Sequence, residues 1–519
     1  LVRSRGLGDV YKRQVSASSA VSTTGAINVY GGDITINANL DTTAGNAAGD
    51  VLLKAAGNIV LDSSRSVTTN GGDVILWANS DGGSTNGGVF FDQLSSVSTA
   101  GGHIWIGGST NDGTPTTQWN GLTVGDGYAV SGRNLVDDFV TRTTVKVNWD
   151  TGVLLNETTL NSGGGHIYIA GQRNARSNHD VGAGVINYSG TNGTTIDSGT
   201  GTIAIEASGT HTLHTPGLLT SLYPAESTGG LTIRSANNTA VNAITINATS
   251  SATGHAGAVV EGNTQILSTA VTNGGGIEFK TAAPGTTIGT WIQVGSLNLL
   301  SASGDITLDA GGGGVGLHQS GTGTNSSGAS FTQTGHLFLG SKTGSAVTNS
   351  SANIAVIADS VLTNTGSSLN VASTGTLTVE SQGNSFNQTL STGQWTLGAN
   401  LSGITLGKAG NTANITVGSA TSIAGPITLH GGNITVNGNI NTSGGGANGD
   451  VLLKASGDIS IAANRSITTS GGDVVLWANS DGQATNGGIF AYSGGNISTG
   501  GGHLWMGGGS GNATWNGLT

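Results

Sequence analysis

Apolar and polar residues alternate over stretches of about five positions along most of the chain, as in "GGDITI" from Gly31 and "GGDVIL" from Gly71. In this period-2 pattern every second side chain faces the same side of a strand, so one face of each strand is apolar. The Gly-Gly pair before each stretch supplies a backbone that turns with positive φ. No 3.6-residue period lasts long enough for a substantial helix. The pattern predicts many short strands joined by tight turns.

The strands share a unit of the form Gly-(Asp/Asn/His)-(Ile/Val/Leu)-x-(Ile/Val/Leu), and its two aliphatic positions are expected to point inward. The polar residue before them is expected to occupy one corner position of the fold, where a small polar turn-former is needed. The expected inward pairs are Ile34 and Ile36, Val51 and Leu53, Val74 and Leu76, and Ile104 and Ile106. The expected corner residues are Asp33, Asp73, Asp473, His103, His166 and Asn433.

A second, longer repeat has a period of 400 residues. Residues 25–110 align without a gap with residues 425–510 and are identical at 48 of 86 positions. The identities cluster, with 15 of 18 in positions 71–88 and 3 of 12 in positions 89–100. A coil block spanning 25–123 is therefore duplicated at 425–519, and the clustering indicates that "GGDVILWANSDG" does a physical job in both copies.

Short strands at even spacing could form a sandwich, a propeller or a solenoid. A sandwich would divide the chain into several domains, and the composition shows no break between domains. A propeller would carry a blade signature about every 40–50 residues, and none is present. The pattern favours an all-β fold with few or no helices, a right-handed parallel β-helix or β-solenoid continuous over 15–519. About 20–25 coils stacked about 4.8 Å apart would give a rod about 100–120 Å long.

Charge and cysteine content exclude several classes of protein. The chain has 519 residues with a net charge of −11, no cysteine and no basic patch, so neither a nucleic-acid partner nor a disulfide framework is expected. No apolar stretch approaches the roughly 18 residues that span a bilayer, so membrane insertion is not expected. Residues 1–14, "LVRSRGLGDVYKRQ", are unusually basic. They resemble a translated adapter of non-native origin, with a native basic linker as the alternative.

Aromatic side chains are the candidate ligand contacts. Outward-facing rings on a polar rod can stack on the flat C–H face of a sugar, and they can equally lie under a loop or over the neighbouring coil. Cover or packing is the favoured interpretation of the two. The candidates for contact with a ligand are Trp77, Trp105, Tyr168, Trp477 and Trp505.

Catalytic, metal and cofactor sites are not expected. A corner that accepts His, Asp or Asn does not specify a general base. The "NSDG" turns, with Asp81 and Asp481, offer one carboxylate each, which is too few for calcium. The densest charge of the chain, at 133–180, forms a loop excursion that could carry the two carboxylates of a polysaccharide lyase or glycoside hydrolase, although loops collect charge because they are wet. Its charged residues are Asp137, Asp138, Asp150, Asp180, Arg142, Arg173, Arg176 and His179.

The Gly-Gly-Asp/His coils, the abundance of Asn, Thr and Ser, and the lack of Cys resemble the repeat shaft of filamentous-haemagglutinin-like adhesins, which are large bacterial exoproteins. The resemblance implies an internal repeat-region fragment of such a protein, located outside the cell or on the bacterial surface. It also implies a structural and adhesive shaft that mediates attachment or biofilm contacts. Its partners would be glycans, surface proteins of a host or neighbouring cell, and flanking repeats of the same longer chain. The alternatives are the glycan-cleaving enzyme above and an inert spacer stalk.

Overall fold

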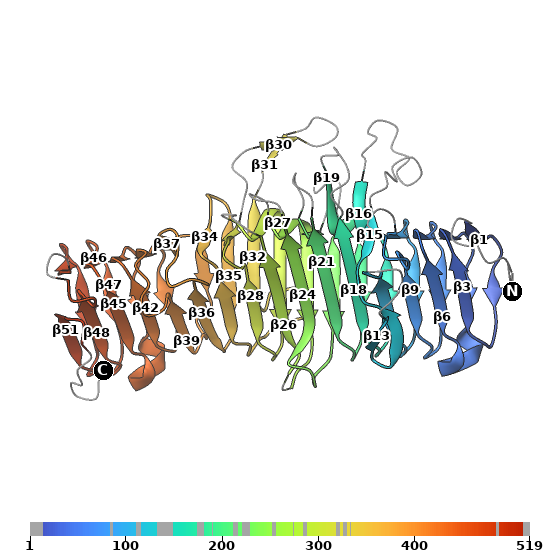
Figure 1. Ribbon diagram of the computed structural model, residues 1–519. Helices are drawn as coiled ribbons and strands as arrows, with labels where there is room; N and C mark the ends of the chain where they lie inside the picture. The colour runs from blue at the N-terminus through green and yellow to red at the C-terminus, as the bar shows by residue number, and fades with distance from the viewer. Residues whose placement is uncertain are drawn as a thin grey trace.

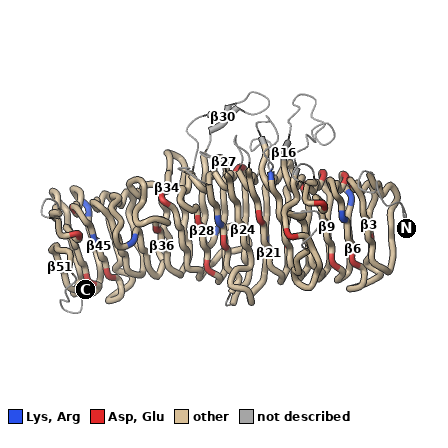
Figure 2. Tube along the Cα trace, viewed as in Figure 1, with Lys and Arg blue, Asp and Glu red and all other residues tan. Residues whose placement is uncertain are grey.

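The computed structural model shows a straight rod of stacked parallel strands, with the N-terminal coils at one end and the C-terminal coils at the other (Figure 1). The rod is a parallel β-solenoid, as the alternation of apolar and polar residues predicts. Acidic and basic residues are distributed along the whole rod rather than gathered in one place (Figure 2). The structure describes residues 14–83, 87–110, 116–131, 149–173, 181–188, 190–210, 216–220, 229–251, 256–272, 274–283, 288–317, 322–324, 330–332, 334–483 and 487–511.

Each coil contributes strands to up to three faces. Face 1 is one continuous sheet, and in the described part of the chain sixteen successive strands pair in parallel along it, with β15 (Ala129–Ser131) extending the β12 layer. These strands are β3 (Ile27–Gly31), β6 (Val51–Ala55), β9 (Val74–Trp77), β12 (Ile104–Gly107), β18 (Ile167–Arg173), β21 (Ile203–Gly209), β24 (Asn242–Ser250), β26 (Gly276–Ala282), β28 (Ile306–Asp309), β33 (Ile354–Ile357), β36 (Thr376–Glu380), β39 (Gly403–Leu406), β42 (Ile427–Gly431), β45 (Val451–Ala455), β48 (Val474–Ala478) and β51 (Leu504–Gly508).

Faces 2 and 3 complete the coils, and the long strands β25 and β27 cross from one to the other in the middle of the rod. Face 2 consists of β1 (Val15–Ala17), β4 (Ile34–Ile36), β7 (Ile59–Leu61), β10 (Val89–Phe91), β16 (Trp149–Asn156), β19 (Val181–Tyr188), β22 (Leu218–Leu219), β25 (Ala258–Ser268), β27 (Thr290–Ser301), β29 (Gly314–Gly316), β34 (Ser360–Leu362), β37 (Leu390–Ser391), β40 (Ile415–Val417), β43 (Ile434–Val436), β46 (Ile459–Ile461) and β49 (Ile489–Ala491). Face 3 consists of β2 (Val21–Ser22), β5 (Leu40–Asp41), β8 (Ser66–Thr68), β11 (Ser96–Ser98), β17 (Thr159–Asn161), β20 (Thr194–Asp197), β23 (Leu231–Ser235), the second halves of β25 and β27, β32 (Gly335–Gly340), β35 (Ser368–Ala372), β38 (Trp395–Leu397), β41 (Thr421–Ser422), β44 (Ile440–Asn441), β47 (Ser466–Thr468) and β50 (Asn496–Ser498).

The inward aliphatic side chains form one continuous core along the rod. Val51 pairs with Val74, and Val74 pairs with Ile104 in the next coil. All eight side chains of the expected inward pairs are fully buried in the same cluster, which extends to Ala478. Fully burying such a side chain stabilises the fold by about 1.5–3 kcal/mol, and a coil cannot achieve this without its neighbours. The prediction of the inward pairs is confirmed.

A Thr-x-Gly-Gly turn explains the glycine pairs. The hydroxyl of Thr69 donates a hydrogen bond back to the carbonyl of Gly72, and Gly71 between them has φ of +88°. A Cβ on Gly102, which follows the same turn in the next coil, would lie 2.1 Å from the Gly72 oxygen. The second glycine is therefore required because successive corners approach each other through their backbones.

The expected corner residues occupy two corners, not one. Asp73, His103, His166 and Asp473 precede face-1 strands, whereas Asp33 and Asn433 precede β4 and β43 of face 2. Both corners use the same bond: the side chain accepts a hydrogen bond from a backbone N–H one coil further on, as from Asn58 to Asp33 at the face-2 corner and from His103 to Asp73 at the face-1 corner. The sequence unit looks alike on both faces because the same hydrogen bond is needed at each corner.

The coils are longer than the repeat unit suggested, so the rod is shorter. Along face 1 the step from His103 to His166 takes 63 residues, whereas Asp50 to Asp73 takes 23. Sixteen layers at about 4.8 Å correspond to a rod about 75–80 Å long, against the expected 100–120 Å. Part of the difference is the β13–β14 hairpin, and part is the length of strands such as β25 and β27, with 11 and 12 residues.

Few elements depart from the parallel coils. The described helices are the 3-10 segments η2 (Thr43–Ala48) and η3 (Ser443–Asn448), which occupy the same position in the two copies of the 400-residue repeat. Two antiparallel hairpins, β13 (Thr116–Trp119) with β14 (Leu122–Gly125) and β30 (Thr322–Thr324) with β31 (Ser330–Thr332), branch from the rod. Of the segment 1–14, residues 1–13 lie outside the described residues, as do residues 512–519 at the end of the second repeat copy.

Candidate functional site

A cluster of aromatic side chains lies on the outer surface of face 1. In adjacent coils Trp105 pairs with Tyr168, and Trp77 pairs with Gly107. The Trp77 and Trp105 rings meet edge to face with centroids 6.2 Å apart, and the Trp105 and Tyr168 rings stack with centroids 6.2 Å apart. These are favourable arrangements of aromatic quadrupoles. Three of the candidate ligand contacts are thus brought together in one outward ladder.

The β13–β14 hairpin covers this ladder. Its turn is Asn120-Gly121, and both residues have positive φ, as a two-residue hairpin turn requires. Val124 of the hairpin is fully buried against Trp77 and Trp105. The ring of Trp119 lies 6.0 Å from that of Tyr168, so the hairpin contributes an aromatic ring of its own. The hairpin escaped the sequence interpretation, although "WNGL" is a strong local signal for one.

Polar contacts fix the edges of the cluster. The indole N–H of Trp77 donates to the hydroxyl of Ser109 at 2.9 Å. Nζ of Lys54 lies 3.5 Å from the Trp77 ring centroid, a cation–π contact from the preceding coil. Burial lowers the pKa of Lys54. Ser109 and Lys54 thus hold the Trp77 indole from two sides.

In the first copy, the cover over these rings decides between packing and ligand contact. The exposed fraction is 3% for Trp77 and 2% for Trp105, and Tyr168 is half-buried. Neither indole face is open to a sugar ring in this arrangement. The rings act as packing beneath a hairpin, and ligand contact by them remains a prediction that would require the hairpin to move.

The second copy of the repeat has counterparts of Lys54, Trp77 and Trp105. Lys454 lies 3.7 Å from the Trp477 ring centroid, and the Trp477 indole N–H donates to the Gly509 carbonyl at 2.8 Å. Trp477 is 5% exposed and meets Trp505 edge to face at 5.9 Å. Trp505 is half-buried. Trp505 is therefore the most accessible of the candidate indoles in the described chain. The second "WNGLT" motif lies outside the described residues.

Outward apolar groups on the other faces follow the same principle. On face 2, Ile186 and Leu219 form a buried cluster. On face 3, Leu300 is covered together with Val347, and Lys342 lies 4.0 Å from the neighbouring Phe338 ring. Lys342 also donates to the side-chain carbonyl of Asn298 at 2.8 Å. These outward apolar residues are buried where chain packs over the coils, whereas Tyr30, Phe490 and Tyr492 are exposed aromatic side chains elsewhere on the rod.

The charged segment 133–180 is described over 149–173, and the expectation of a loop excursion is wrong for this part, because it forms the coil strands β16, β17 and β18. Asp137, Asp138, Arg142, Arg176, His179 and Asp180 lie outside the described residues, and of Asp150 only the strand is described. Arg173 is fully buried, and its Nη1 donates to the carbonyl of Gly182 at 3.2 Å. This contact gives Arg173 a structural role at the end of β18.

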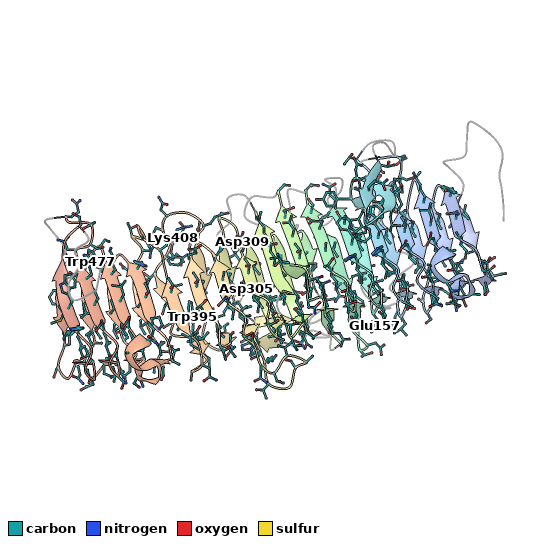
Figure 3. The ribbon with its side chains drawn as sticks, turned by 90° about the horizontal axis from the view of Figure 1, so that it is seen from below. Glu157, Asp305, Asp309, Trp395, Lys408 and Trp477 are labelled. Carbon is teal, nitrogen blue, oxygen red and sulfur yellow. The ribbon has the colours of Figure 1, made fainter. Side chains whose placement is uncertain are left out.

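One carboxylate in the same region, that of Glu157, is fully engaged in structure. Glu157 is 3% exposed, and its oxygens accept hydrogen bonds from Gln93 at 2.8 Å and from Asn192 at 3.1 and 3.2 Å. Burial raises its pKa, but the hydrogen bonds from Asn192 and Gln93 outweigh burial and keep the pKa below its usual range. Figure 3 shows Glu157 and Trp477 far apart along the rod. Glu157 thus connects three coils through these hydrogen bonds.

Glu261 is the described carboxyl whose protonation state departs furthest from normal. Burial raises its pKa to about 7, a value that suits a general acid. Hydrolysis of a glycosidic bond needs a second carboxylate about 5–10 Å away. Burial is the whole cause of the shift, and no neighbouring charge within the described residues contributes to it.

Metal binding finds no support in the described coils. The side chain of Asp81 accepts a hydrogen bond from the backbone N–H of Gly83 at 3.1 Å, and Asp481 does the same for Gln483. These residues cap turns, as expected for "NSDG". Within the described residues no group of three or more His, Asp or Glu side chains is arranged to hold a metal ion.

No family model matches the chain, and no curated protein and no solved structure matches it either. Neither short helix of the described chain is long and apolar enough to cross a membrane. The fold and the contacts above are therefore the basis for assigning a function.

Proposed function

We propose that this chain is the structural shaft of a large bacterial exoprotein, displayed on or released from the cell surface and used for attachment. The proposal agrees with the resemblance of its coils to the shaft of filamentous-haemagglutinin-like adhesins. It also agrees with the contacts of the described aromatic and charged candidates. Most of these side chains are engaged in packing, capping and hydrogen bonds between coils.

One observation carries the proposal: a single hydrophobic core continues from Ile34 to Ala478 along one axis. Each coil buries its aliphatic residues only by contact with the coils before and after it, so the coils cannot bend independently. A chain built in this way separates its two ends by a fixed distance. That is the mechanical property that a shaft needs to present a distal site.

The adhesive part of the proposal concerns the surface of the rod. Its partners would be glycans or proteins on the surface of a host or neighbouring cell. The covered indoles of the first copy are poor candidates for the contact, whereas Trp505 is half-buried and remains a candidate. The enzyme alternative gains no support from the described carboxylates, because Glu157 is saturated with hydrogen bonds and Glu261 has no identified partner.

Small-angle scattering on the full chain tests the shaft. We expect a rod whose stacked coils have a length of about 75–80 Å, and this length should not change between low and high salt. Leu53→Asp, which places a carboxylate in the core, should shorten or break the rod, whereas Leu52→Asp on the outward side of the same strand should not. A compact globule, or a chain whose dimensions vary with salt, would contradict the proposal.

Binding assays test adhesion separately. The full chain is applied to a glycan array and to immobilised bacterial and host cells, with the Trp505→Ala variant as the matched comparison. Binding that is weaker in the variant supports an adhesive surface at that end of the described rod. A chain that binds nothing is a spacer, and release of reducing ends from mixed polysaccharides, lost in Asp137→Ala or Asp138→Ala, would favour the enzyme instead.

A further inference from the structure

A continuous row of hydrogen bonds runs along the corner before face 1. Asp50 Oδ1 accepts from the backbone N–H of Asp73 at 2.8 Å, and Asp73 Oδ1 accepts from the backbone N–H of His103 at 2.6 Å. From His103 onward the acceptors in the row are imidazole nitrogens instead of carboxylate oxygens. His103 Nδ1 accepts from the N–H of His166 at 2.8 Å, and His166 Nδ1 accepts from the N–H of Thr202 at 3.0 Å.

The two histidines can fill this role only when they are neutral. Asp, Asn and His each place an acceptor atom at the same distance from Cβ, which explains why these three residues share the corner. In imidazole that acceptor is the Nδ1 lone pair, available only in the tautomer that carries its proton on Nε2. The added proton of an imidazolium would sit on Nδ1 and point at the backbone N–H of the next coil. Protonation therefore removes one hydrogen bond between coils for each histidine.

The groups around His103 differ in charge from those around His166. His103 faces the carboxylate of Asp73, with Asp50 one coil behind, and its ring meets Trp119 of the hairpin edge to face at 5.5 Å. His166 stacks on His103 with centroids 5.1 Å apart. On its other side it meets Thr202, which has no charge.

Within the described chain, the charge that acts on His166 is that of His103, and it has the same sign when both are protonated. The hydroxyl of Thr202 lies 2.8 Å from His166 Nδ1 and could accept a proton-bearing Nδ1, but the Thr202 N–H would then lose its acceptor.

We propose that His103 and His166 form an acid-sensitive joint in the rod: in acid the step between β12 and β18 loosens, and the hairpin over Trp77 and Trp105 is released. The hairpin is coupled to this step because Trp119 contacts both His103 and Tyr168. Acid would thus uncover an aromatic surface that is closed at neutral pH.

The direction of the effect follows from proton linkage. Burial, followed by the charge of His103, lowers the pKa of His166 in the folded chain. An unfolded histidine takes up its proton near pH 6.5. In the acid range below that value the opened chain binds more protons than the folded one, so the stability of the joint falls as the pH falls.

His503 provides an internal comparison. It is the counterpart of His103 in the second copy, but its Nδ1 lies 3.0 Å from Asp473 Oδ1. In this arrangement Nδ1 of His503 faces a carboxylate instead of a backbone N–H.

Hydrogen exchange followed by mass spectrometry on the full chain tests the joint. After correction for the intrinsic pH dependence of exchange, we expect protection of the amides in 101–108 and 164–173 to fall about tenfold between pH 7.4 and pH 5.0. The variant His103→Asn/His166→Asn keeps both acceptors, as Asn58 and Asn433 show, and should have the same protection at both values. His503→Asn is the control and should leave the drop in 101–108 unchanged.

Two results would overturn the joint: equal protection of these peptides in the wild type at both pH values, or a drop that persists in the double Asn variant. Circular dichroism at each pH establishes that the variants retain their strands. Neither result would affect the shaft proposal, which rests on the length and stiffness of the rod at neutral pH.

Discussion

Asp73 accepts a hydrogen bond of 2.6 Å from the backbone N–H of His103, the residue that occupies the same corner one coil later. The bond joins residues 30 positions apart and runs along the axis of the rod. Side chains at the corners therefore hold successive coils in register, in addition to the backbone hydrogen bonds within each sheet.

Replacing Asp73 tests what the corner requires. Asp73→Ala should lower the free energy of unfolding of its coil by about 1–2 kcal/mol, because the His103 N–H loses its acceptor, whereas Asp73→Asn should cost less than half as much. Hydrogen exchange of residues 101–108 measures the effect locally. Asp473→Ala, in the more exposed second copy, is the control and should cost less. An Asn variant as unstable as the Ala variant would show that charge, not acceptance, matters.

A methyl group on Gly125 should lift the hairpin from the aromatic cluster. A Cβ there would lie 2.0 Å from the Gly108 oxygen and 2.8 Å from the indole nitrogen of Trp77. We expect Gly125→Ala to shift tryptophan fluorescence to longer wavelength, since Trp77 and Trp105 gain contact with water. Thr117→Ala on the exposed side of the hairpin should leave the spectrum unchanged. An unaltered spectrum in Gly125→Ala would mean that the hairpin is not the cover.

Equivalent indoles in the two copies should differ in their contribution to stability. Trp105→Ala should lower the free energy of unfolding by about 3–5 kcal/mol, because a side chain only 2% exposed is removed from beneath the hairpin. Trp505→Ala should cost clearly less, since Trp505 is half-buried. Denaturation with urea measures both. If Trp105→Ala were fully stable, the packing role assigned to this ring would be wrong.

Glu261 should make the middle of the rod weaker in alkali. Its pKa of about 7 lies above that of an unfolded glutamate, so the folded chain holds the proton more tightly and its stability falls as the pH rises from about 4.3 through 7. Glu261→Gln should therefore be nearly neutral at pH 5 and stabilising by about 2 kcal/mol at pH 8.5. Thermal unfolding at the two pH values measures the difference. Equal effects at both values would show that Glu261 titrates normally.

The strand pattern could be predicted because it is local. Val51, Val74 and Ile104 alternate with polar residues, and a strand with one apolar face must find another layer to bury it. Gly71 and Gly102 indicated the turns for an equally local reason. Gly71 has a positive φ, and a Cβ on Gly102 would clash with the backbone of the neighbouring coil. The stacking axis followed once sandwich and propeller had been set aside.

The candidate site could be predicted only in part. The alternation correctly placed Trp77 and Trp105 on the outer surface, but alternation does not state what lies beyond that surface. The cover comes from a hairpin that starts at Thr116, whose docking depends on contacts with coils far away in sequence. The sequence also did not show that the corner residues belong to two faces, because Asp33 and Asp73 stand in nearly identical local sequences.

By itself, then, the sequence determined that the chain forms short one-faced strands, where it turns, and that His, Asp and Asn are interchangeable at the corners. Only the tertiary structure decided which face each strand joins, how many layers the rod has, and which outward rings are closed to a ligand. The physical reason is one of range. Alternation, turn conformation and acceptor position are properties of a few neighbouring residues, whereas cover and register depend on hydrogen bonds and packing between residues 20 to 60 positions apart.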